Sequence, residues 1–169
     1  MTLRLTRRFA FEMAHALPLY EGKCHNLHGH SYKLYVTVET SGEWRTESGE
    51  WRVENGEPHS QFSISKDSQF SAPLGMVMDF SAIKRMVEES IVERFDHALV
   101  LPPLPDGTTP PTDQLGGYVA KVIVVPFAPT TENLLLHFAQ LLEGKMPSGV
   151  RLYSLKLYET ENSCAELIL

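Results

Sequence analysis

Cysteine is scarce in this sequence: Cys24 and Cys164 are the only two among 169 residues. Disulfide frameworks belong to small secreted domains, and a chain of this length buries a sizeable core without a bridge. Long apolar runs are also missing, since none approaches 18 residues, and the scattered charges in residues 1–16 do not fit a signal peptide. We therefore expect a cytoplasmic protein with no membrane partner.

Basic residues are in deficit as well. Lysine and arginine together number 15 against 21 acidic residues, which gives a formal net charge of −6. A nucleic-acid binder should present a basic surface, so that class of partner is not expected. An anionic small-molecule substrate would need a local cluster of positive charge, because the overall field repels it. The length predicts one domain over residues 1–169.

Two strands with alternating apolar residues open the chain. Apolar side chains at odd positions predict the core face of the first strand, and apolar side chains at even positions that of the second. His15 continues the odd series, whereas His28 and His30 extend the even series backwards. Three histidines are thus expected at neighbouring strand ends on the core side. The apolar residues are Leu3, Leu5, Phe9, Phe11 and Met13 in the first strand, and Tyr32, Leu34, Val36 and Val38 in the second.

The remainder predicts an α+β fold. The chain order strand–strand–helix–helix–strand–strand (ββααββ) is typical of an antiparallel four-stranded sheet with two helices. Residues 41–75 repeat Ser-Gly-Glu-Trp-Arg at a spacing of seven residues, and we expect a hairpin extension or mobile loop there. The other expected elements are a strand end at 76–80, a helix from Ser81 to about 94, a short strand at 119–125, a helix from Thr130 or Thr131 to Gly144, and strands at 150–160 and 164–169.

The motif Cys24-His-Asn-Leu-His28-Gly-His30 predicts a metal site. In extended backbone, His28 and His30 point to one side about 6.6 Å apart at Cα, and two such imidazoles can bind one ion. With His15 as third ligand, one tetrahedral position stays open, as in catalytic zinc sites. The alternative is Cys24 as a fourth ligand, which would close the site into a structural centre of one cysteine and three histidines.

These motifs resemble those of the 6-pyruvoyl- and 6-carboxytetrahydropterin synthases. The resemblance rests on Cys-x-x-x-His-Gly-His preceded by Phe-Glu-x-x-His, and on three further motifs in the same order. Three residues separate Cys24 from His28, as in the bacterial carboxytetrahydropterin synthases of queuosine biosynthesis, whereas the animal-type pyruvoyl enzymes have five. The further motifs are Phe-Asp-His at 95–97, Pro-Thr-Thr-Glu-Asn at 129–133 and Leu-Tyr-Glu-Thr at 157–160.

The resemblance implies a tunnelling fold, assembled as a homohexamer of two trimers with active sites between subunits. It also implies a zinc-dependent lyase that converts 7,8-dihydroneopterin triphosphate into 6-carboxy-5,6,7,8-tetrahydropterin, acetaldehyde and triphosphate. The rival activity is that of a pyruvoyl synthase, which stops before carbon–carbon cleavage. The implied residue roles are zinc binding by His15, His28 and His30, proton transfer by Cys24 with Asp96 and His97, and pterin binding by Glu159, Thr130 and Thr131.

Several of these roles compete with simpler interpretations. Glu159 ends an apolar strand face, where it either binds a ligand or reaches solvent. Thr130 and Thr131 are also typical helix N-caps. Asp96 and His97 are sequence neighbours, so their contact requires a turn, or the pair acts across subunits. The segments 41–75 and 101–118 lie outside the matched motifs, and the residues that contact the triphosphate are not identifiable.

Overall fold

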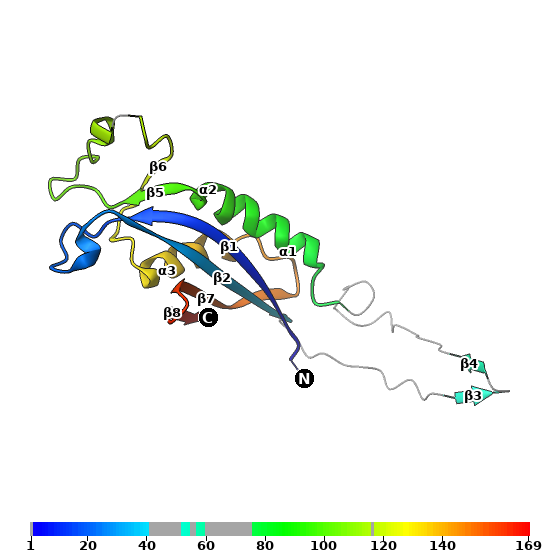
Figure 1. Ribbon diagram of the computed structural model, residues 1–169. Helices are drawn as coiled ribbons and strands as arrows, with labels where there is room; N and C mark the ends of the chain where they lie inside the picture. The colour runs from blue at the N-terminus through cyan, green and yellow to red at the C-terminus, as the bar shows by residue number, and fades with distance from the viewer. Residues whose placement is uncertain (1, 41–51, 55–56, 60–75, 116) are drawn as a thin grey trace.

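A six-stranded mixed sheet forms the body of the protein (Figure 1). The computed structural model describes residues 2–40, 52–54, 57–59, 76–115 and 117–169. The strand order is β6-β5-β1-β2-β7-β8. β1, β2, β7 and β8 are antiparallel neighbours, whereas β5 is parallel to β1 and β6 is parallel to β5. The bounds are β1 (Arg4–His15), β2 (His28–Thr40), β5 (Ala98–Leu101), β6 (Val122–Val124), β7 (Val150–Thr160) and β8 (Ser163–Ile168).

Helices cover one face of this sheet, behind β1 and β2 in Figure 1. The first helical stretch begins as α1 (Phe80–Val87), continues through a π-helical turn, η3 (Glu88–Val92), and ends as α2 (Glu93–Phe95). The second is α3 (Thr131–Glu143). Short 3₁₀ turns, η1 (Lys23–His25) and η4 (Thr112–Leu115), lie in loops. Within the described residues, no helix is long and apolar enough to cross a membrane.

The core lies between the helices and the covered face of the sheet. The predicted alternation of the second strand is confirmed, because its four apolar residues are fully buried. That of the first strand is confirmed for Phe9, Phe11 and Met13, whereas Leu5 is half-buried and Leu3, before β1, is exposed. From α3, the ring of Phe138 packs edge-on against Phe95 and Phe11, with centroids 5.0 and 6.1 Å away. One aromatic cluster thereby ties both helical stretches to β1.

The expected four-stranded antiparallel sheet is wrong in two respects. The structure has six strands in this sheet, and two of them are parallel to their neighbours. The four residues of β5 show no alternation, since a parallel strand in mid-sheet is buried on both faces. The short apolar run therefore gave no strand signal, although the predicted strand at 119–125 is confirmed in part by β6.

The start of the first helix also differs from the prediction. Residues 76–80 form no strand end, because the chain turns at Asp79 directly into α1. Asp79 is the N-cap in place of Ser81, and its carboxylate accepts a hydrogen bond from the Ser81 N–H at 2.6 Å. Asp and Ser are comparably good caps, so composition alone did not separate these two positions.

The insertion at 41–75 is described only in part. β3 (Arg52–Glu54) and β4 (Glu57–His59) pair in antiparallel fashion, which agrees with the predicted hairpin extension. The remaining residues of the repeat, including both tryptophans, lie outside the described residues.

Replacement of Phe138 by alanine should destabilise the protein, because it opens a cavity between both helical stretches and β1. We expect a loss of about 3–5 kcal/mol in the free energy of unfolding, measured by urea denaturation at fixed protein concentration. Gln140→Ala, on the exposed side of the same helix, should change the free energy by about 0.5 kcal/mol or less. Equal effects of the two changes would contradict this description of the core.

Candidate metal centre and active site

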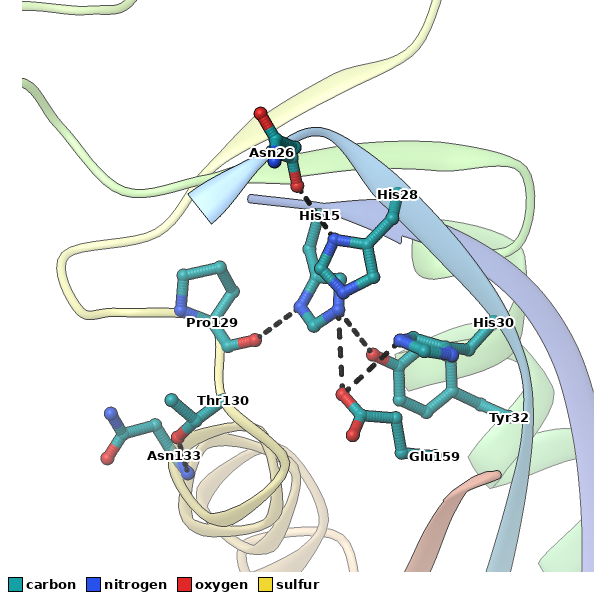
Figure 2. Close-up of polar contacts among 9 residues, drawn as sticks. All are labelled: His15, Asn26, His28, His30, Tyr32, Pro129, Thr130, Asn133 and Glu159. Atoms are coloured by element: carbon teal, nitrogen blue, oxygen red, sulfur yellow. Dashed lines mark hydrogen bonds and ion pairs between the residues drawn. The ribbon is translucent and has the colours of Figure 1, made fainter. Parts of the chain in front are cut away.

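Three imidazoles converge where β1 ends and β2 begins (Figure 2). In the antiparallel register, His15 lies opposite His28, and Met13 lies opposite His30. Side chains directly opposite each other share a face, so all three rings point to the core side. One ring nitrogen from each of the three lies within 4.8 Å of the others. The predicted convergence is confirmed.

The hydrogen bonds of two of these rings point the Nε2 lone pairs at the centre of the cluster. His15 Nδ1 lies 2.8 Å from the Pro129 carbonyl oxygen, and His28 Nδ1 lies 2.8 Å from that of Asn26. A carbonyl only accepts, so each Nδ1 carries the proton and donates it. A histidine that binds a metal usually donates its other N–H in this way.

The donor set fits a metal ion. Nε2 of His28 and Nε2 of His30 are buried and have no hydrogen-bond partner, which is rare for buried polar atoms. Burial lowers the pKa of His15, and positive charge on His28 and His30 would lower it further, although the Pro129 carbonyl raises it. The neutral imidazole is the form that binds a metal. Three imidazole nitrogens suit zinc, with one position left for another ligand.

Glu159, near the end of β7, lies at the cluster and not in solvent. Its Oε1 is 3.5 Å from His15 Nε2 and 3.6 Å from His30 Nε2, and only 26% of its side chain is exposed. The interpretation of Glu159 as a solvated strand-end carboxylate is therefore wrong. Its role toward a ligand stays a prediction.

The fully buried Tyr32 lies beneath this group, with its hydroxyl oxygen 3.4 Å from His15 Nε2 (Figure 2). Burial raises the pKa of the Tyr32 phenol, and the charge of Glu159 and a hydrogen bond to its carboxylate raise it further. The hydroxyl is therefore neutral, and as a donor it can serve His15 Nε2 or the Glu159 carboxylate. Sequence analysis placed Tyr32 in the core and missed this polar contact, because alternation reports burial alone.

Cys24 lies in η1, half-buried, and its thiol is free, as is that of Cys164. The backbone fixes this turn, since the N–H of Leu17 donates to the carbonyl of Cys24 at 2.9 Å. Among the described residues, the cluster of converging metal-binding atoms contains the three histidines without Cys24. The geometry thus gives no support to a closed site in which Cys24 is the fourth ligand.

Asp96 and His97 do meet through a turn, as the sequence required. His97 has a φ of 56°, in the left-handed region, and its Nδ1 lies 2.9 Å from Asp96 Oδ2. The backbone of Glu12 on β1 holds both: its N–H donates to Asp96 Oδ1 at 2.9 Å, and its carbonyl accepts the N–H of His97 at 2.6 Å. This pair is therefore docked on the strand that ends at His15.

The environment keeps the Asp96 carboxylate ionised. Partial burial raises its pKa, but hydrogen bonds from Glu12 and His97 and the charge of Lys121 lower it below the ordinary value. The His97 side chain is 77% exposed. Within the described part of the chain, no hydrogen bond joins the pair to Cys24.

Thr130 is the N-cap of α3, and its Oγ1 accepts the N–H of Asn133 at 3.3 Å (Figure 2). The capping interpretation is thereby confirmed for Thr130, while Thr131 is buried in the first turn. Contact of either residue with a ligand stays a prediction. The Pro129 carbonyl was missed, because backbone acceptors leave no signature in residue type.

Comparison with known proteins identifies the family of this chain. The sequence pattern of the family described as 6-pyruvoyl tetrahydropterin synthase matches residues 4–51 and 59–168. The 6-carboxy-5,6,7,8-tetrahydropterin synthase of Haemophilus influenzae is 31% identical over 163 residues, with 96% of each chain covered. The human 6-pyruvoyl tetrahydrobiopterin synthase is 27% identical over 173 aligned positions, with 95% of this chain and 87% of that one covered.

A solved structure shows the same fold. The 6-pyruvoyl tetrahydropterin synthase of Caenorhabditis elegans superimposes with a TM-score of 0.56 at 20% identity, with 100% of this chain and 96% of that one covered. The resemblance inferred from the motifs is therefore confirmed at the level of sequence pattern, relatives and fold. The chain belongs to the 6-pyruvoyl tetrahydropterin synthase family.

Proposed function

We propose that this enzyme is a zinc-dependent lyase of the 6-carboxytetrahydropterin synthase type. The reaction converts 7,8-dihydroneopterin triphosphate and one water into 6-carboxy-5,6,7,8-tetrahydropterin, acetaldehyde and triphosphate. The observation that carries the proposal is the three-histidine cluster with two buried, unpartnered Nε2 atoms next to the Glu159 carboxylate. The three-residue spacing between Cys24 and His28, together with the name of the Haemophilus relative, favours the carboxy product.

His15, His28 and His30 are proposed to hold the zinc ion. Bound there, zinc would act as a Lewis acid toward the hydroxyl oxygens of the substrate side chain and stabilise developing negative charge. The protein's part is to keep the rings neutral and oriented. The Pro129 and Asn26 carbonyls do this for His15 and His28, because each fixes the proton on Nδ1.

Glu159 is proposed to bind the pterin ring. A pterin presents adjacent N–H donors, and a carboxylate can accept two of them side by side. The Tyr32 hydroxyl would hold this carboxylate at the edge of the histidine cluster, so that the bound ring places its side chain next to the metal. Thr130 and Thr131 lie at the N-terminus of α3 and are proposed to complete the binding site.

Cys24 is proposed to move protons at the carbon atoms beside those hydroxyl groups. Abstraction of such a proton needs a base near neutral pH, and a half-buried free thiol can be activated as a thiolate. Asp96 fixes the orientation of the His97 ring through their hydrogen bond. Because His97 is exposed and, among the described residues, has no hydrogen bond to Cys24 of its own chain, we propose that it relays protons to Cys24 of a neighbouring subunit in a homohexamer.

Two alternatives remain as second candidates. A pyruvoyl synthase would eliminate triphosphate from the same substrate without cleaving a carbon–carbon bond, and the human relative carries that name. The candidate from another class is a non-catalytic domain whose structural zinc site consists of Cys24 and the three histidines. The convergence of the histidines without Cys24 weighs against the latter.

Incubation with 7,8-dihydroneopterin triphosphate should yield 6-carboxytetrahydropterin and acetaldehyde, identified by chromatography and mass spectrometry. Removal of metal by a chelator should abolish turnover, because the three imidazoles then hold no Lewis acid. Added zinc should restore it. Triphosphate release without acetaldehyde would identify the pyruvoyl synthase instead. Absence of any product from zinc-loaded protein would refute both enzymatic candidates.

Cys24→Ala should keep about one zinc per chain and lower kcat by roughly 10²–10⁴-fold, because it removes a proton carrier and not a ligand. Metal analysis and steady-state kinetics measure the two effects. Cys164→Ala, which removes the exposed thiol, is the control and should match the wild type. Loss of zinc from Cys24→Ala would instead support the structural site with Cys24 as a ligand.

Mixed oligomers of Cys24→Ala and His97→Ala should regain activity, because some sites then combine an intact Cys24 with an intact His97 from the neighbour. Equal random mixing restores about a quarter of the sites if one neighbour supplies His97. The assay compares co-expressed variants with each variant alone. If all three preparations are equally inactive, the pair does not act across subunits.

A further inference from the structure

The segment after β5 ends at a lysine that reaches the turn carrying Asp96 and His97. The chain returns from this segment as β6, and the carbonyl of Lys121, directly before β6, accepts the N–H of Leu99 at 2.9 Å. The Lys121 ammonium nitrogen lies 2.6 Å from the Glu93 carbonyl oxygen and 2.7 Å from that of Asp96. Backbone pairing to β5 thus places this ammonium under the end of α2.

The acceptors are the carbonyl of Glu93, in the last turn of the helix, and that of Asp96, its C-cap. Helix C-termini leave carbonyl groups without partners and carry partial negative charge, so an ammonium ion that donates to two of them stabilises the end of the helix. The residue that follows, His97, has a φ of 56°. Glycine usually occupies such a position after a helix, and a histidine there needs support from its surroundings.

The contacts of Lys121 point to the backbone of this turn and not to a surface ion pair. In the part of the chain that the structure describes, its ammonium donates to two main-chain oxygens and has no carboxylate partner. The Glu12 backbone holds the same turn from the other side, through Asp96 Oδ1 and the His97 N–H. The turn is therefore clamped between β1 and the start of β6.

We propose that Lys121 is a positioning residue for the Asp96–His97 pair. Its ammonium ion fixes the end of α2, so that the Asp96 carboxylate holds the His97 imidazole in the orientation in which it relays protons. This inference rests on the proposed function of the pair. The segment at 101–118 matched none of the motifs in the sequence. We infer that it leads the chain back to the sheet edge, where Lys121 contacts the turn.

A second lysine provides a matched control. Lys145, which follows the C-cap Gly144 of α3, donates to Ser90 Oγ at 2.6 Å in the π-helical turn of the same helical stretch. Its acceptor is a side chain that precedes the Asp96–His97 turn, and neither carbonyl that Lys121 contacts takes part. Lys145→Met therefore removes a lysine contact of comparable length from this helical stretch without touching the turn.

The first experiment measures hydrogen exchange at the amide of His97 in substrate-free protein, where activity plays no part. In Lys121→Met this amide should exchange roughly tenfold faster or more, because two charge-assisted hydrogen bonds that hold the turn are lost. Lys121→Arg should restore most of the protection, and Lys145→Met should leave it unchanged. Unchanged exchange in Lys121→Met would overturn the proposal.

The second experiment compares kinetics with 7,8-dihydroneopterin triphosphate. Lys121→Met should lower kcat by roughly tenfold or more with little change in KM or zinc content, since the ammonium donates to the Glu93 and Asp96 carbonyls and to none of the three histidines. Partial recovery in Lys121→Arg is expected, and Lys145→Met should match the wild type. Equal kcat in Lys121→Met and Lys145→Met would overturn the positioning role. If the wild type itself shows no turnover, the proposed function fails, and the exchange measurement alone decides whether Lys121 holds the turn.

Discussion

The pairing of β1 with β2 is the constraint on which the site depends. Side chains alternate between the two faces of a strand, so a shift of one residue in this register would send His28 and His30 to the opposite face from His15. The fully buried residues of β2 prevent that shift, because it would expose Leu34, Val36 and their neighbours. The hydrophobic core therefore specifies the three-histidine cluster, although the residues that fix the register lie further along β2.

The residues proposed to hold a metal and those proposed to move protons lie in separate places. The three histidine rings lie on the two central strands, and carbonyls fix the Nδ1 protons of His15 and His28. The Asp96–His97 pair lies on a turn at the other side of β1, held by the Glu12 backbone. Because both sets are attached to β1, this strand sets the spacing between them.

The sequence predicted best those features that burial dictates. Alternation along the first two strands located the three histidines, and the 3–4 spacing located α3 and its cap. Three kinds of feature escaped: β5, because a strand buried on both faces has no alternation; the Pro129 and Asn26 acceptors, because every residue carries the same carbonyl; and the Lys121 contact, because it depends on how distant segments meet. Residue type records chemistry and exposure, but not which main-chain atoms end up adjacent.

The π-helical turn at Glu88–Val92 determines how α2 and the Asp96–His97 turn are rotated about the helix axis. Such a turn accommodates one residue more than regular α-helix, so the end of the stretch is rotated by about 100° relative to an uninterrupted helix. A relative that lacked one residue in this turn would form a regular α-helix. Its counterparts of Asp96 and His97 would then point in a different direction relative to β1. The irregular turn therefore determines the direction in which the Asp96 and His97 side chains point.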